Sequence, residues 1–68
     1  MKYLVVLEKA EENWAAYSPD VSGCIATGRT PEETMRRYEK ALRFHLEGLR
    51  EDGLPMPEPA ARAVTVEL

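Results

Sequence analysis

The 68-residue sequence predicts a single α+β domain, residues 1–68, with the element order β-β-β-α-β. Three observations support this fold class. One long segment has the apolar period of an amphipathic helix, short segments on both sides of it alternate as strands do, and Pro, Gly, Asp and Asn gather between them. We expect a three-stranded antiparallel sheet, one helix packed on one face, and a fourth strand beside the first.

The helix is predicted for residues 31–52. Thr30 is a suitable N-cap, Pro31 fits the first helical position, and Glu33 completes a Thr-x-x-Glu capping box. Gly53 can adopt the left-handed conformation that ends a helix. One apolar stripe runs along the helix, with Ala41 and His45 at its edge: Met35, Tyr38, Leu42, Leu46 and Leu49. The stripe requires an apolar partner surface, whereas Phe44 falls on the opposite, solvent-facing side.

Strands are predicted for residues 2–8, 14–18, 24–27 and 63–68. The first is apolar on both faces, which is typical of a central strand covered on both sides. A crossover through the helix allows the last strand to lie parallel to the first, which would make the first strand central. Because one helix covers one face only, we expect a second copy or another protein on the other. The predicted self-association residues are Val6, Leu4 and Phe44, in a homodimer or homotetramer.

Composition and length limit the function. The net charge of −3 argues against a free-standing nucleic-acid binder and is compatible with a basic protein partner. No segment has the apolar length of a membrane span and the N-terminus lacks a signal-peptide pattern, so the cytoplasm is the expected location. A chain this short buries a small core, and Cys24 has no second cysteine for a disulfide. Self-association is therefore the expected source of additional stability.

Patterns for catalysis, metals and cofactors are weak. Cys24 and His45 are the one nucleophile–base combination, but no orienting third residue or oxyanion motif accompanies them, and packing roles are favoured. A lone cysteine and a lone histidine do not supply the four ligands of a structural zinc site. We expect no metal and no cofactor. Asp20, the acid in the loop after the second strand, is interpreted as a turn-stabilising or partner-contacting residue.

Several motifs, in this order, resemble the HicB family of antitoxins. They are Tyr3-Leu4-Val5-Val6-Leu7-Glu8, then Ala16-Tyr17-Ser18-Pro19-Asp20-Val21-Ser22-Gly23-Cys24, then Gly28-x-Thr30-x-Glu32-Glu33, and finally Gly53-Leu54-Pro55-Met56-Pro57-Glu58-Pro59. They are similar to the family patterns aromatic-x-P-D-x-x-G-C, G-D-T-x-E-E-A and G-x-x-I-P-x-P, over nearly the whole chain. Arg29 and Thr34 depart from the Asp and Ala that the family usually has there.

The resemblance implies a partial RNase H-like fold and a non-enzymatic protein. Such antitoxins neutralise a HicA-type toxin, a small basic protein that cleaves messenger RNA, by covering its active surface. The acid cluster of RNase H enzymes is missing here, so no nuclease activity is expected. Many relatives carry a C-terminal DNA-binding domain, and because the sequence stops before one, direct DNA binding is not expected. The predicted partner-binding residues surround the hairpin and the loop after it: Trp14, Tyr17, Pro19, Asp20 and Ser22.

An alternative function remains open. The chain would then be a stand-alone self-associating module without a toxin partner, which binds a small ligand or has a structural role. The antitoxin interpretation predicts a basic protein partner, and the alternative predicts none.

Overall fold

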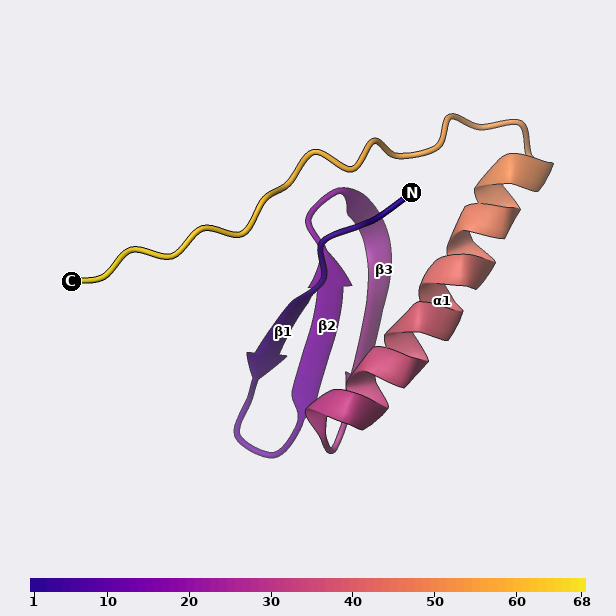
Figure 1. Ribbon diagram of the computed structural model, residues 1–68. Helices are drawn as coiled ribbons and strands as arrows, with labels where there is room; N and C mark the ends of the chain where they lie inside the picture. The colour runs from indigo at the N-terminus through magenta and orange to yellow at the C-terminus, as the bar shows by residue number, and fades with distance from the viewer.

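The computed structural model describes residues 1–68 and contains three strands and one helix (Figure 1). The elements in chain order are β1 (Val6–Lys9), β2 (Trp14–Ser18), β3 (Val21–Gly28) and α1 (Pro31–Glu51). The strands form one antiparallel sheet in the order β1-β2-β3. The helix packs on one face of this sheet, chiefly on β3 and β2. The α+β class, with one helix on a three-stranded sheet, is therefore confirmed.

Local signals set both ends of α1. Thr30 is extended, with φ −128° and ψ 158°, and its side-chain oxygen accepts a hydrogen bond of 3.0 Å from the backbone N–H of Glu33. Gly53 follows the helix with φ 70°, and the backbone N–H of Leu54 donates to the Leu49 carbonyl at 2.9 Å. The observed helix ends at Glu51, one residue before the predicted end.

The core lies between α1 and the sheet. Its buried apolar residues are Ala16, Val21, Cys24 and Tyr38, with Tyr3, Val5, Ala26, Ala41 and Leu42 packed against them. The predicted stripe of α1 thus faces the sheet, while Phe44 is 79% exposed, as expected for a residue outside the stripe. Only seven of the 68 residues are buried, so much apolar surface remains accessible for a partner chain.

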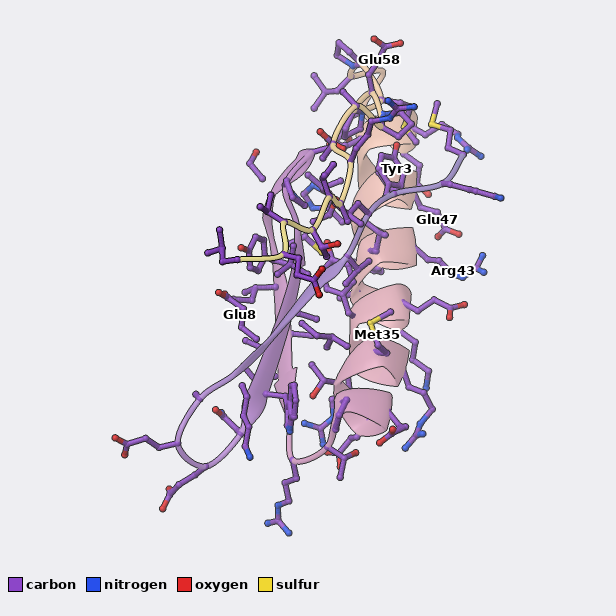
Figure 2. All side chains as sticks on the ribbon, turned by 60° about the vertical axis from the view of Figure 1, so that its left-hand side comes forward. Tyr3, Glu8, Met35, Arg43, Glu47 and Glu58 are labelled. Atoms are coloured by element: carbon purple, nitrogen blue, oxygen red, sulfur yellow. The ribbon has the colours of Figure 1, made fainter.

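The other face of the sheet has no helix over it, and we call it the open face. Val6 pairs with Tyr17 in the β1–β2 ladder, and Tyr17 pairs with Ile25 in the β2–β3 ladder. Directly paired residues share a face, and Tyr17 alternates with the buried Ala16, so this row points away from α1. Figure 2 shows α1 on one side of the sheet only. An apolar row therefore crosses the open face.

Two predictions about the sheet are wrong for the single chain. The first strand is at the edge, and β2 is central. Residues 63–68 form no strand, and their apolar side chains are exposed: Val64 by 82%, Val66 by 77% and Leu68 by 113%. The physical reason is that two apolar faces indicate cover above and below a strand, not which strands flank it. Tyr3 and Val5 pack into the core, but nothing in this chain flanks the outer edge of β1.

Strand boundaries also differ from the predicted ones. The first strand begins at Val6 rather than at residue 2, and β3 begins at Val21 rather than at residue 24. The earlier start of β3 depends on Gly23, whose φ of 77° is in the region that favours glycine. The β2–β3 ladder is irregular beside Gly23: Tyr17 pairs with Ile25, and after a register shift Ser18 pairs with Val21.

The chain after α1, residues 54–68, is an extended tail anchored at two points. The Tyr3 hydroxyl donates to the Pro57 carbonyl at 2.8 Å. The Asp20 carboxylate accepts hydrogen bonds from the backbone N–H groups of Ala60 and Ala61, at 3.0 and 2.9 Å. Beyond these anchors the tail continues past the β1 side of the sheet and away from the body (Figure 1).

Candidate functional site

The predicted partner-binding residues do not form one cluster. Tyr17 is half-buried on the open face. Pro19, Asp20 and Ser22 lie at the β2–β3 turn, with Ser22 exposed. Trp14 is at the opposite end of β2. It shares a face with the buried Ala16, two residues further on, and therefore points to the α1 side. The structure therefore brings four of the five residues to one end of the hairpin and separates Trp14 from them.

Asp20 has a role within the chain that its position in the sequence does not reveal. Its carboxylate bonds two successive backbone N–H groups of the tail, 40 and 41 positions further on. A carboxylate with two such donors holds the tail at the end of the sheet. In the sequence, Asp20 is an acid in a turn, and this pattern fits a local turn role as well as it fits a long-range contact.

The open face has the properties of a protein-binding surface. Its apolar row consists of Val6, Tyr17 and Ile25, and Ile25 is 65% exposed. Glu8 pairs with Ala15 on the same face, and the exposed residues 11–12, both glutamates, follow in the β1–β2 turn. An apolar centre with an acidic border suits a partner that presents apolar side chains among positive charges.

A second feature is a hollow of about 480 Å³ between β3 and α1. Cys24 and His45 both line it, so the structure does bring the predicted pair to one place. Cys24 is only 8% exposed, however, and no group of three or more His, Cys, Asp or Glu side chains suitable for a metal is found. Phe44 and Gly48 also line this hollow. We therefore interpret this hollow as a packing surface.

The predicted self-association residues lie on different surfaces. Val6 belongs to the row on the open face, and Leu4 alternates with the core residues Tyr3 and Val5. Phe44 is instead beside β3, on the flank of α1. The three side chains are therefore not parts of one continuous patch.

Tyr38 is the titratable group most affected by the fold. Its ring is fully buried and its hydroxyl has no hydrogen-bond partner of good geometry. Burial raises the pKa of this hydroxyl from its ordinary value of 10.0, and the nearby Cys24 thiol raises it further, whereas the Ser18 backbone acts in the opposite direction. The side chain has no access to a substrate, so we assign it to the core.

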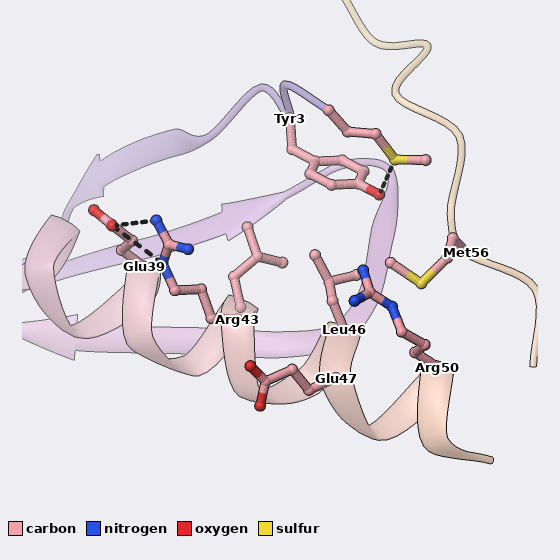
Figure 3. A pocket seen from close by; sticks show the side chains of 9 residues that line it. Tyr3, Glu39, Arg43, Leu46, Glu47, Arg50 and Met56 are labelled. Carbon is pink, nitrogen blue, oxygen red and sulfur yellow. Dashed lines mark hydrogen bonds and ion pairs between the residues drawn. The ribbon is translucent and has the colours of Figure 1, made fainter. Parts of the chain in front are cut away.

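The third feature is a groove of about 530 Å³ between the N-terminal segment and α1, which we call the α1 groove (Figure 3). Apolar side chains supply more than half of its lining: Met1, Tyr3, Leu42, Leu46 and Met56. Charged residues border it, and Arg43 is paired with Glu39 at 3.1 Å. Its helix residues lie on the flank opposite to Phe44 and Gly48, which face β3. The groove is thus on the β1 side of the molecule.

These features define a two-layer α+β domain whose exposed surface offers a sheet edge, an apolar row and grooves. No helix has the length and apolar character that a bilayer span requires. Residues 3–67 match the family described as HicB_like antitoxin of bacterial toxin-antitoxin system. The chain belongs to this HicB-like antitoxin family, as the sequence motifs predict.

Individual relatives agree with this assignment. The chain is 36% identical over 58 residues to an uncharacterized 14.9 kDa protein from the rep-hol intergenic region of Haemophilus phage HP1, covering 85% of this chain and 44% of the phage protein. It is 35% identical over 49 residues to a UPF0150 protein of Helicobacter pylori J99, covering 72% and 68%. The chain therefore spans less than half of the phage relative.

A solved structure is also similar. It is described as a HicA3 and HicB3 toxin-antitoxin complex, and the match has a TM-score of 0.72 and 32% sequence identity. The similarity covers 88% of this chain and 70% of the matched chain. The family match and the fold similarity thus agree with each other.

Proposed function

We propose that this chain is a non-enzymatic antitoxin domain that binds a small basic HicA-type toxin and neutralises it by masking its active surface. The observation that carries the proposal is the similarity, at 32% identity and a TM-score of 0.72, to a chain of a HicA3 and HicB3 complex. The net charge of −3 agrees with a basic partner. Masking requires an accessible surface rather than reactive groups, and the open face is such a surface.

The proposed contact is centred on Tyr17 and Ile25 of the open face and continues to Pro19 and Ser22. The aromatic ring of Tyr17 offers apolar area together with a hydroxyl, which is a combination common at interface centres. Glu8 borders the row on the same face and would attract a basic toxin during approach. Asp20 contributes by holding the tail, whereas Trp14, which points to the α1 side of the sheet, stays outside this contact.

We infer further that residues 63–68 become a fourth strand beside β1 in the functional assembly. The alternation of Val64, Val66 and Leu68 with polar residues supports this inference, since the apolar side chains are otherwise exposed to water. The resulting sheet would have the partial RNase H-like order, with β1 between β2 and the added strand.

Co-expression with candidate HicA-type toxins tests the antitoxin proposal. We expect the chain to relieve the growth arrest caused by one such toxin and to co-purify with it. The variant Glu8→Lys is expected to weaken this binding by roughly fivefold at low salt, with a smaller difference at high salt. Glu51→Lys, at the end of α1, is the matched control, because it changes the charge away from the open face.

The antitoxin proposal fails if no basic partner is retained and no growth arrest is relieved. A chain that self-associates under those conditions would favour the stand-alone module instead. Equal weakening by the Glu51→Lys control would show that net charge, not the open face, determines binding.

A further inference from the structure

We propose that two copies of this chain exchange their tails, so that residues 62–68 of each copy form a parallel strand beside β1 of the other. The inference concerns assembly alone, and it stands or falls independently of any toxin. It explains two features that the single chain leaves unpartnered: the outer edge of β1 and the apolar end of the tail.

The outer edge of β1 is free to accept a strand. β1 pairs with β2 on one side and with nothing on the other. The backbone N–H and C=O groups of such an edge can pair with an extended segment of another chain. Lys9 and Glu8 stand at the far end of the strand, whereas Tyr3 to Val6 are apolar and half-buried. The edge is therefore most receptive near its beginning.

The end of the tail has the properties of a strand that lacks its sheet. Val64, Val66 and Leu68 alternate with Thr65 and Glu67, which gives one apolar and one polar face. All three apolar side chains are at least 77% exposed. Residues 62–68 span roughly 20 Å when extended, which is about the length of the segment from Tyr3 to Lys9.

The anchors direct the tail away from its own β1. The Tyr3–Pro57 and Asp20–Ala61 hydrogen bonds fix it across the end of the sheet where β1 begins. From there it continues outward, beyond the β1 side (Figure 1). To pair with its own β1 the chain would have to change direction within residues 61–63, which contain no Gly, Pro, Asn or Asp. The preceding proline-rich connector is also stiff.

The α1 groove is the place that the incoming strand would fill. It lies on the β1 side of α1 and is lined by Tyr3, Leu42 and Leu46 (Figure 3). A strand added beside β1 would turn one face toward this flank of α1, and Val64 and Val66 are the apolar side chains available for it. Thr65 and Glu67 would then face the open side, where polar groups remain hydrated.

Reciprocal exchange closes the assembly. If the tail of one copy reaches the β1 of the other, the same contact forms in the reverse direction, as a two-fold symmetric dimer requires. Both free β1 edges and both apolar tails are then used at once, and no unpaired β1 edge is left for a third copy.

The test uses the unmodified chain without a toxin. Sedimentation at micromolar concentration should give a dimer. In a 1:1 mixture of isotope-labelled and unlabelled chains, filtered NMR experiments should detect contacts between the methyl groups of Val64 or Val66 and the ring of Tyr3 across copies. A monomer, a dimer whose tail methyl groups contact nothing, or the same contacts found within one chain only would each overturn the proposal.

A matched pair of variants adds a quantitative test. Val66→Asp places a charge on the apolar face in both tails and should weaken dimerisation by roughly 100-fold or more. Thr65→Asp places the same charge on the polar face and should change the dimer constant by less than about tenfold. Equal effects of the two variants would contradict the assignment of faces. Because dimerisation is measured alone, this result is separate from toxin binding.

Discussion

The carboxylate of Asp20 accepts a hydrogen bond of 2.9 Å from the backbone N–H of Ala61, a residue 41 positions further along the chain. The same oxygen accepts a second bond from the neighbouring Ala60. A single side chain in the β2–β3 turn therefore determines where the chain after α1 leaves the body. Its position in the sequence suggests a turn-stabilising or partner-contacting residue and does not reveal this long-range contact.

Replacing Asp20 should release the tail. In Asp20→Ala both hydrogen bonds are lost, each worth about 0.5–1.5 kcal/mol, so we expect amide exchange at Ala60 and Ala61 to become roughly tenfold faster. Native-state hydrogen exchange by NMR measures this change. Glu58→Ala is the control, because Glu58 is exposed in the same tail and should leave both amides as protected as before. Unchanged exchange in Asp20→Ala would mean that the tail is held elsewhere.

Two glycines should respond in opposite directions to substitution by alanine. A Cβ at Gly28 would lie 2.6 Å from the Thr34 Oγ1 and 3.0 Å from the Thr34 backbone nitrogen. Thr34 is buried and its hydroxyl donates to the Thr30 carbonyl at 2.7 Å, so it has little room to move. We expect Gly28→Ala to lower the free energy of unfolding by about 1–3 kcal/mol.

Gly48→Ala is the matched comparison. A Cβ there meets nothing within 4 Å, and the residue is inside α1. Alanine is the better helix former, so this variant should raise the free energy of unfolding by about 0.5–1 kcal/mol. Urea denaturation of both variants measures the difference. Equal destabilisation by the two substitutions would refute the close packing assigned to Gly28.

The N-cap of α1 should be important for stability. Thr30→Ala removes the oxygen that accepts the Glu33 N–H, and we expect a loss of about 1 kcal/mol in the free energy of unfolding. Thr30→Ser keeps the hydroxyl and should retain most of the stability. Thermal unfolding followed by circular dichroism compares the two. If Ser and Ala are equally destabilising, the hydroxyl is not the stabilising group.

Tyr38 should make stability depend on pH at high pH. Its pKa is raised in the folded state, so the folded chain keeps its proton at pH values where the unfolded chain has lost it. The stabilisation is fully present below pH 10.0, the ordinary value, and is lost as the pH rises through the higher folded-state pKa. The free energy of unfolding should therefore fall above about pH 10.

Tyr38→Phe should remove this part of the pH dependence. Because the hydroxyl is buried without a good partner, the variant should be as stable as the parent, within about 1 kcal/mol, at neutral pH. Denaturation curves from pH 8 to pH 11 measure both effects, and Tyr17→Phe, on the open face, serves as the control. A steep alkaline loss that persists in Tyr38→Phe would assign it to another group.

The helix and the central hairpin strand could be predicted because their signals are local. Thr30, Pro31 and Glu33 begin α1, and Gly53 follows its end, within a few residues of the groups that they contact. The apolar stripe of α1 is likewise a repeat over a few residues, and it correctly predicts that Tyr38 is in the core and Phe44 is exposed. The family motifs depend on the same short stretches of sequence.

The position of the first strand could not be predicted in the same way. Its two apolar faces predict a central strand covered on both sides, but apolar periodicity carries no information about strand edges, and β1 lies at the edge of the sheet with one face open. The candidate site was affected similarly: Tyr17 and Ser22 are accessible, whereas Trp14 is separated from them by the length of β2, and Asp20 is engaged by the tail. Strand alternation was sufficient to place Trp14 and Tyr17 on opposite faces, but only the hydrogen bonds reveal the role of Asp20.

The α+β class, the start of α1 and its end to within one residue, and the family could all be read from the sequence. Tertiary structure alone decided that β1 has a free edge, that Asp20 holds Ala61, and that residues 62–68 leave the body. The reason is the range of the interactions. Helix caps and apolar periodicity depend on residues a few positions apart. A strand with alternating side chains can instead pair with any free sheet edge, and its actual neighbour depends on where distant contacts direct the chain.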